Sequence, residues 1–307
     1  MSDFDDILVG AIDLHRHGFP EITRDFRTPL ADADDIALCR DAGMTAVVLK
    51  SHTWPTMGRA ILLEQLVQGI RVVGSVTLNP IAGGMRPEVV ELAARQGAGV
   101  VYLPTVGAHN DVERGGISHT IETQLGHFDA HSLPSTTVLD DEGRLTGELN
   151  AVLDVIDEHR LMVYSGHLAP HEVLAIARDG RLADRFVFSH PDSHSIGADD
   201  ATIVEIARLG GFIEICALGT YPRIGRITPA GLARIVGLVG AERCVLTTDY
   251  FFDWCPPSSI MLADLARDLA AEGISRAELD LMLRRNPSHL LANTLTTPIP
   301  APEEETP

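Results

Sequence analysis

The sequence lacks the features that mark membrane and secreted proteins. No stretch reaches the roughly 18 consecutive apolar residues of a membrane-spanning helix, and residues 1–10 have neither the basic segment nor the apolar run of a secretory signal. The four cysteines are scattered and form no CxxC pair, which favours reduced structural thiols over a disulfide framework. We therefore expect a cytoplasmic protein without a membrane partner.

Basic residues are also scarce. The chain has 24 Lys and Arg against 43 Asp and Glu, which gives a formal net charge of −19 at pH 7. A nucleic-acid-binding protein normally presents a basic face or stripe, and an anionic membrane surface would repel so acidic a chain. The charge therefore argues against both partners, and we expect a small-molecule substrate instead.

What the sequence does have is eight short runs that are apolar throughout. Such runs are typical of strands buried on both faces, as in a parallel sheet. They are ILVGAIDLH (7–15), TAVVLKSH (45–52), IRVVGSVTLN (70–79), GVVYLP (99–104), RLMVYSGH (160–167), RFVFSH (185–190), GFIEIC (211–216) and RCVLTTDY (243–250).

Amphipathic helical patterns separate these runs. The stretch 32–43 opens with aspartates, which accept hydrogen bonds from free N–H groups at a helix start, and closes with glycine. Comparable patterns occupy 58–69, 86–97, 148–159, 169–180, 199–210 and 229–240, with one or two further helices in 259–292.

Strand and helix alternate along the whole chain, and this alternation predicts the fold. Eight βα units in this length indicate an α/β protein with a closed (β/α)₈ TIM barrel. An open doubly wound sheet is the alternative, but no GxGxxG loop follows the first strand. We expect one barrel domain over residues 1–293 and a disordered Pro- and Glu-rich tail over 294–307.

A long insertion between the fourth and fifth strands, at about 105–147, interrupts this rhythm. It contains His109, His119, His127 and His131. Long barrel loops of this kind often cover an active site, and a surface excursion or an oligomer contact is the alternative.

Polar residues gather where the predicted strands end, which is where barrel enzymes carry their chemistry. They are Asp13, His15 and His17 on the first strand, Lys50 and His52 on the second, then His167, His190, Glu214 and Asp249 on the fifth to eighth. Alternate strand residues face the same side, so His15 and His17 both point into the barrel mouth. A single histidine of this kind is more often a core residue. Imidazoles from several strands together with a carboxylate instead predict a divalent metal, zinc before manganese, iron or nickel.

These motifs resemble the amidohydrolase superfamily of metal-dependent hydrolases. The resemblance rests on DLHRH on the first strand, YSGH and FSH on the fifth and sixth, TTDY on the eighth and RRNPSHLL near the end. It extends over nearly the whole chain to about residue 292. The segments VVLKSHTWPT and LDDEGRLTGEL resemble an uncharacterised branch of that superfamily.

The resemblance implies roles for individual residues. His15 and His17 would be ligands of one metal, with Asp249 beside it. His167 and His190 would bind a second metal, or one would be a ligand and the other a catalytic histidine in a one-metal site. Asp249 would be the general base that takes a proton from the attacking water and passes it to the leaving group.

The sequence departs from the superfamily at the fourth strand. Two-metal members usually carry a bridging carboxylated lysine or a glutamate there, whereas this strand ends VVYLPTV. Lys50 on the second strand is either carboxylated and bridges the metals, or stays cationic and holds the substrate or polarises its carbonyl; an ion pair with Asp13 or Glu214 is the structural alternative. His52 is a further candidate ligand, so the metal count is one or two.

Several residues near these strand ends are candidate substrate contacts. His194 follows His190 in SHPDSH and is a candidate for stabilising the developing oxyanion, unless it lies on a loop surface. The aromatic candidates are Trp54, Tyr102, Phe251 and Trp254, which could equally be core residues. Arg223 and Arg226 in TYPRIGR carry guanidinium groups that suit a carboxylate or phosphate, although loop arginines are commonly solvated.

These observations predict a metal-dependent hydrolase in which activated water attacks an amide, lactam, lactone or related carbonyl centre. A metal-dependent decarboxylase, which needs only one metal to hold the substrate carboxylate, is the alternative on the same scaffold. A non-catalytic barrel that binds metal or ligand is a third hypothesis. We also expect a homo-oligomer, although no feature of the sequence sets its order.

Overall fold

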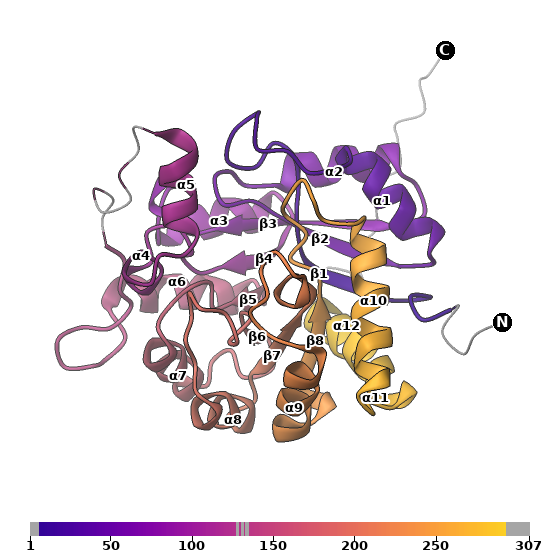
Figure 1. Cartoon of the computed structure of the whole chain (residues 1–307). Helices are drawn as coiled ribbons and strands as arrows, with labels where there is room; N and C mark the ends of the chain where they lie inside the picture. The colour runs from indigo at the N-terminus through magenta and orange to yellow at the C-terminus, as the bar shows by residue number, and fades with distance from the viewer. Residues whose placement is uncertain (1–5, 127–128, 130–131, 133–134, 293–307) are drawn as a thin grey trace, which may run out of the picture.

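A computed structural model describes residues 6–126, 129, 132 and 135–292 as a barrel of eight parallel strands in sequential order. Figure 1 shows the strands at the centre and the helices around them. The predicted (β/α)₈ fold is therefore confirmed. The strands are β1 (Ile12–His17), β2 (Ala46–Lys50), β3 (Arg71–Thr77), β4 (Ala98–Tyr102), β5 (Met162–Tyr164), β6 (Phe186–Phe188), β7 (Phe212–Cys216) and β8 (Cys244–Thr247).

The first strand begins later than the apolar run 7–15 predicts. Residues 6–10 form a turn, in which Gly10 has a φ of +79°, a conformation that glycine adopts without a steric cost. Ile7 and Leu8 are buried all the same. The apolar character of these residues therefore predicts correctly that they are buried, but not that they form a strand.

The barrel closes where β1 meets the residues that follow β8. The backbone N–H of His17 donates to the carbonyl oxygen of Tyr250 at 2.9 Å, and that of Asp249 donates to the carbonyl oxygen of His15 at 2.8 Å. Arg16 and Tyr250 form a parallel bridge at the same place. These bonds bring the polar ends of the first and last strands together.

The helices surround the strands and match the predicted pattern closely (Figure 1). They are α1 (Asp32–Asp41), α2 (Met57–Leu66), α3 (Pro87–Arg95), α4 (His109–Glu113), α5 (Ile117–Leu125), α6 (Gly147–Glu158), α7 (Pro170–Asp179), α8 (Asp200–Arg208), α9 (Pro229–Val239), α10 (Ser258–Ala271), α11 (Arg276–Asp280) and α12 (Asn286–Leu290). Local sequence fixes several starts: the side chains of Thr146, Asp199 and Thr228 accept hydrogen bonds from the first turns of α6, α8 and α9. No described helix is both long enough and apolar enough to cross a membrane.

The core has two layers. One fills the inside of the barrel and includes Leu14, Val48, Tyr102, Tyr164 and Val245. The other lies between the strands and the helices. Strands buried on both faces in this way explain why the sequence shows continuous apolar runs instead of alternation.

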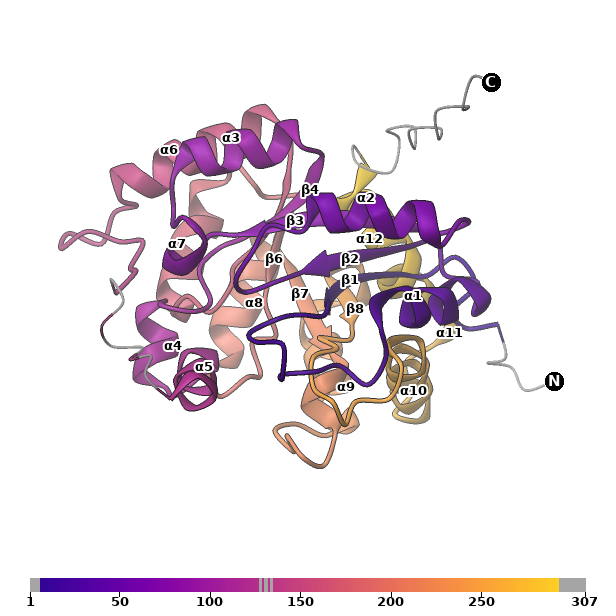
Figure 2. The same ribbon diagram turned by 90° about the horizontal axis from the view of Figure 1, so that it is seen from above.

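The insertion at about 105–147 carries α4 and α5 and lies on the same side of the barrel as the loops after β1 and β8 (Figure 2). The side-chain amide of Asn110 donates to the carbonyl oxygens of His167 (3.2 Å) and Ser195 (2.6 Å), which anchors α4 to loops at the carboxyl ends of the strands. His127, His131 and the tail expected at 294–307 lie outside the described residues.

Candidate metal centre

The two histidines of β1 converge with Asp249 at the carboxyl end of the barrel. Oδ1 of Asp249 lies 3.2 Å from Nε2 of His15 and 3.3 Å from Nε2 of His17. Both histidines are buried, and the Asp249 side chain is 14% exposed. One ligand atom from each of the three residues lies within 4.8 Å of the others, close enough to hold one metal ion.

Carboxylates hold both imidazoles by the opposite ring nitrogen. Nδ1 of His15 is 2.8 Å from Oε1 of Glu214 on β7, and Nδ1 of His17 is 2.7 Å from Oε1 of Glu21 in the loop after β1. A metal-binding histidine commonly donates its second ring N–H to a carboxylate, which fixes the tautomer and leaves Nε2 as the ligand. The residues present therefore fit a divalent cation.

The pairing of β1 with β2 is irregular at the residues that carry the two histidines. Pairing with β2 slips between Asp13 and Arg16, as at the bulges that often flank active sites. The Asp13 carboxylate does not enter the site. It accepts hydrogen bonds from the Thr248 hydroxyl (2.5 Å) and the His15 backbone N–H (3.1 Å).

The backbone is strained at two of the polar strand ends. Asp249 has a φ of +49° and His190 a φ of +20°, in the region that side chains other than glycine seldom adopt. Their N–H groups donate to the His15 carbonyl oxygen (2.8 Å) and to Oε2 of Glu214 (2.8 Å). Such strain persists only where the surroundings enforce it, and it clusters at functional sites.

The second strand adds two groups to the centre. Nζ of Lys50 lies 2.9 Å from Nε2 of His15 and 4.9 Å from the ring centre of Tyr102. The His52 ring stacks on that of His17, with centroids 4.5 Å apart. Lys50 is thus directed at the histidine cluster. Among the described residues, neither Asp13 nor Glu214 forms an ion pair with it.

Glu21 joins the first two strands at this point. Its Oε1 accepts from the His52 backbone N–H (2.6 Å) and lies 2.8 Å from the Nδ1 of that residue, while its Oε2 accepts from the Ser51 hydroxyl (3.1 Å). Glu21, His17 and His52 form a second group close enough to hold a metal. Because these hydrogen bonds already occupy both carboxylate oxygens, the geometry favours Glu21 as the group that orients the two imidazoles.

The histidines after β5 and β6 complete the cluster. Nδ1 of His167 is 2.5 Å from Oδ1 of Asp111 on α4, so the insertion orients one of the predicted ligands. The His190 ring lies 5.1 Å from that of His167 and 5.9 Å from that of His15. Nδ1 of His190 is buried and has no hydrogen-bond partner in the described part of the chain. A buried polar atom without a partner calls for an explanation, and a bound ion supplies one.

Burial disfavours the charged form of several of these imidazoles. Desolvation lowers the pKa of His52 to about 3 and also lowers the pKa values of His15 and His190. Burial alone would raise the pKa of Asp249, but His15 and His17 outweigh it and hold that pKa well below its usual range. Neutral imidazoles beside an ionised carboxylate are the state in which these residues bind metal.

A hollow of about 300 Å³ opens over this cluster. The residues of the cluster that line it are Lys50, His52, His167, His190 and Asp249. The insertion contributes Gly115, Gly116, Ile117 and Thr120, and the loops after β6, β7 and β8 contribute Ser193, His194, Ser195, Leu218, Ile224, Arg226, Phe251 and Phe252. A lining that combines polar groups with apolar side chains suits a small organic ligand.

Only some of the predicted substrate contacts line this hollow. His194 lines it, whereas Trp54 is 67% exposed elsewhere. Tyr102 is fully buried inside the barrel, where its hydroxyl donates to the Leu14 carbonyl oxygen at 2.7 Å. Arg223 is exposed and stacks on Trp254 at 5.5 Å, outside the hollow. Of the two arginines that the sequence suggested, Arg226 lines the hollow and Arg223 does not.

Sequence reasoning missed two carboxylates of the candidate site. Glu21 lies in the loop after β1 and Asp111 on α4 of the insertion, and nothing in their local sequence pairs them with histidines on strands. Glu214, in the middle of β7, was already among the polar residues expected near the strand ends. The only role that the sequence had suggested for it was an ion pair with Lys50.

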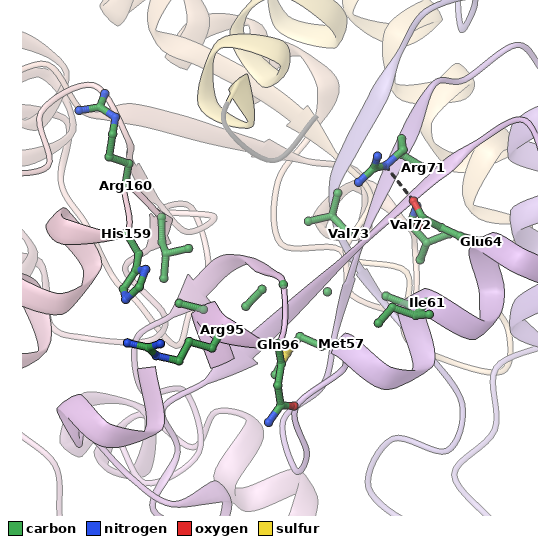
Figure 3. Close-up of a pocket in the computed structure, with 16 residues that line it drawn as sticks. Met57, Ile61, Glu64, Arg71, Val72, Val73, Arg95, Gln96, His159 and Arg160 are labelled. Carbon is green, nitrogen blue, oxygen red and sulfur yellow. Dashed lines mark hydrogen bonds and ion pairs between the residues drawn. The ribbon is translucent and has the colours of Figure 1, made fainter. Parts of the chain in front are cut away.

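A second hollow, of about 460 Å³, lies near the amino ends of β3 and β4 (Figure 3). Its charged groups already have partners: Arg71 pairs with Glu64 at 2.8 Å, and Arg95 and His159 both pair with Glu91. Barrel enzymes carry their chemistry at the opposite end. This hollow is therefore a poor candidate for the site.

The profile of a family described as being of unknown function, DUF6282, matches residues 10–214, more than half of the chain. No curated protein matches the chain.

Solved structures share the fold. An amidohydrolase from Pseudomonas aeruginosa has 12% sequence identity and a TM-score of 0.64 over 95% of this chain and 98% of its own. A triple mutant of an organophosphorus hydrolase from Deinococcus radiodurans has 17% identity and a TM-score of 0.58 over 93% and 94%. A dipeptidase described as an M19 metallopeptidase has 12% identity and a TM-score of 0.53 over 94% and 99%. These structures share the (β/α)₈ barrel that the sequence predicted.

Proposed function

The chain belongs to the DUF6282 family of unknown function, and we propose that it is a metal-dependent hydrolase of a small molecule. The enzyme would cleave the bond between the carbonyl carbon and its leaving group in an amide, a lactam, a lactone or a related compound. The observation that carries the proposal is the convergence of His15 Nε2, His17 Nε2 and Asp249 Oδ1, with each histidine held by a carboxylate on its other ring nitrogen.

His15, His17 and Asp249 would hold the metal, with His167, His190 and His52 as further ligands for the same ion or a second one. Zinc suits this set of imidazoles and carboxylate, and manganese, iron and nickel are alternatives. When bound, the metal supplies Lewis acidity, which lowers the pKa of a water molecule and polarises a carbonyl group. The protein has to provide a proton acceptor and a fixed geometry for that chemistry.

Asp249 is the proton acceptor. Its carboxylate is ionised, faces both β1 histidines and lines the hollow. It takes a proton from the attacking water and returns it to the leaving group as the bond breaks. Its strained backbone, fixed by the hydrogen bond to His15, keeps the carboxylate at one position.

Lys50 and His194 stabilise the negative charge that develops on the substrate oxygen. Lys50 is buried and lines the hollow, and its Nζ lies 2.9 Å from Nε2 of His15. His194 also lines the hollow and is exposed. Donors held in place before the reaction contribute more than mobile ones, since no reorganisation is required.

A decarboxylase is the second candidate, and one observation favours it. Strand β4 ends at Tyr102 and supplies neither an acid nor a lysine that could bridge two metals. A single ion that holds a substrate carboxylate would then be sufficient. The 300 Å³ hollow supports a small-molecule substrate for either reaction.

Elemental analysis and activity assays test these proposals together. We expect the purified full-length protein to contain a divalent transition metal, and chelation to abolish hydrolysis of a member of an amide, lactam and lactone panel. Re-addition of the metal should restore it. Carbon dioxide release without hydrolysis would identify the decarboxylase, and protein purified without transition metal would contradict both.

A further inference from the structure

Arg226 is a cation at the mouth of the hollow that neither the metal centre nor the proposed mechanism uses. It follows β7 and the short 3₁₀ helix Ala217–Thr220, and it lines the same hollow as His190 and Asp249. Its side chain is 16% exposed. Arginine is seldom buried to this extent unless its N–H groups have partners.

The Arg226 side chain is held on one edge. Its Nε donates to Oδ2 of the buried Asp192 at 2.8 Å, and its backbone N–H donates to the Gly219 carbonyl oxygen at 3.1 Å. The guanidinium lies against Gly219, where an added Cβ would come within 2.9 Å of both Nε and Nη2. The guanidinium can occupy this position because residue 219 has no side chain.

The guanidinium is only partly satisfied. Nη2 shares the Nε edge, is buried and has no hydrogen-bond partner among the described residues, and the same holds for Oδ1 of Asp192. The opposite end, Nη1, makes no hydrogen bond within the described part of the chain, and Arg226 lines the hollow. A guanidinium offers N–H donors in a fixed plane, which suits the oxygens of a carboxylate. An anionic group of a ligand in the hollow would bind at the Nη1 end.

The surroundings favour a carboxylate over a more highly charged anion. Asp192 and Asp249 lie close enough to Arg226 to raise its pKa, so a dianion would meet stronger repulsion than a monoanion. Leu218, Ile224, Phe251 and Phe252 supply an apolar wall in the same hollow. A carboxylate joined to a small apolar group matches both features.

We propose that Arg226 binds a carboxylate of the substrate and so restricts the enzyme to small organic acids with a hydrolysable carbonyl group. The carboxylate lies at Arg226, the apolar part lies against Phe251 and Phe252, and the scissile carbonyl lies over Asp249 and the β1 histidines. The inference rests on the proposed function for the position of the scissile bond. The anion site itself does not require hydrolysis.

Calorimetry with a matched pair of probes, 3-phenylpropanoate and its neutral amide, tests the site. Full-length protein freed of metal by chelation is used, since a carboxylate could otherwise bind the metal itself. We expect wild-type protein to bind the carboxylate about tenfold more tightly than the amide, and Arg226→Gln to abolish that preference. Arg223→Gln is the matched control, because Arg223 is exposed and lies outside the hollow, and it should keep the preference.

Gly219→Ala gives an independent variant in case Arg226→Gln does not fold. It keeps the charge but displaces the flexible end of Arg226, so the preference for the carboxylate should fall while the amide binds as before. Equal binding of both probes to wild type, no binding of the carboxylate, or a preference that survives in Gly219→Ala and Arg226→Gln would overturn the proposal. A preference that persists without any hydrolase activity would reject the proposed function and leave the anion site standing.

Discussion

The backbone N–H of Asp249 donates to the carbonyl oxygen of His15 at 2.8 Å, and the carboxylate of Asp249 lies 3.2 Å from Nε2 of that same histidine. The hydrogen bonds that close the barrel therefore also assemble the candidate metal centre. Closure of the fold and formation of the site are coupled, because both depend on the contact between the first strand and the end of the last.

Asp249→Asn tests the proton acceptor with little change in shape. Asparagine tolerates the positive φ at this position better than other residues, so we expect the protein to fold normally. Loss of a general base should lower kcat by about 10²- to 10⁴-fold. Steady-state kinetics on a substrate from the panel measures this, with metal content checked alongside. Full turnover by the variant would show that another group accepts the proton.

His15→Asn and His17→Asn should each lose most of the bound metal, because each removes an imidazole that faces Asp249. The exposed His171 on α7 provides the control, and His171→Asn should keep the wild-type metal content. Elemental analysis of the purified variants measures the effect. Wild-type metal content in both strand variants would place the metal elsewhere.

Glu21→Gln tests the carboxylate that orients His17 and His52. Loss of such a partner typically weakens metal binding by about 10- to 100-fold without removing a ligand. Competition with a chromogenic chelator gives the affinity, and circular dichroism checks the fold. The exposed Glu88→Gln serves as the control. An unchanged metal affinity in Glu21→Gln would show that Glu21 does not support metal binding.

The metal-free protein should lose stability on acidification from about pH 7 to about pH 5. Burial lowers the pKa values of His15, His52 and His190, so the unfolded chain takes up more protons than the folded chain in this range, and its free energy falls relative to the folded state. Asp13 opposes this, because burial raises its pKa to about 7 and the folded chain binds its proton more tightly. The three histidines outnumber it.

Thermal melts at several pH values after chelation measure this dependence. His52→Gln should flatten it, because glutamine does not titrate, whereas the exposed His171→Gln should leave the slope unchanged. A melting temperature of the wild-type apoprotein that stays constant or rises on acidification would be incompatible with neutral buried histidines.

The four cysteines should be unreactive in the native protein. All are buried and free, and burial raises the pKa of Cys39 to about 12 and also raises the pKa values of the other three. Since the thiolate is the reactive species, a thiol reagent at pH about 8 should label none of them rapidly, and all four after denaturation. Rapid labelling of the folded protein would show that a thiol is accessible.

The barrel and the strand-end histidines could be predicted because both follow from regular repetition. Strands buried on both faces give continuous apolar runs, and the first polar residues after them fall at one end of the barrel. His15, His17, His167, His190 and Asp249 were predicted in this way, and they lie together in the structure. The start of β1 was missed, because Ile7 and Leu8 are as apolar as a strand but lie in a turn.

The partners of these residues could not be predicted, because they depend on how loops fold. Glu21 and Asp111 reach histidines only after the β1 loop and the insertion have packed over the barrel. Arg223 and Arg226 lie three positions apart in one loop, and tertiary contacts likewise determine which of them lines the hollow. Asp192 and Gly219 hold the second arginine in the hollow, while the first stacks on Trp254.

The register shift in β1 gives the segment DLHRH an unusual sensitivity to length. Arg16 lies between the two histidines in sequence and pairs with Asp35 of α1 at 3.0 Å, outside the barrel. Shifting a strand by one residue exchanges its two faces. Deleting a single residue here would turn the arginine toward the candidate metal centre and the imidazoles toward the helix. A substitution changes one side chain on one face, whereas an insertion or deletion moves every following side chain of the strand to the opposite face. Changes in the length of this segment should therefore be tolerated less well than single substitutions.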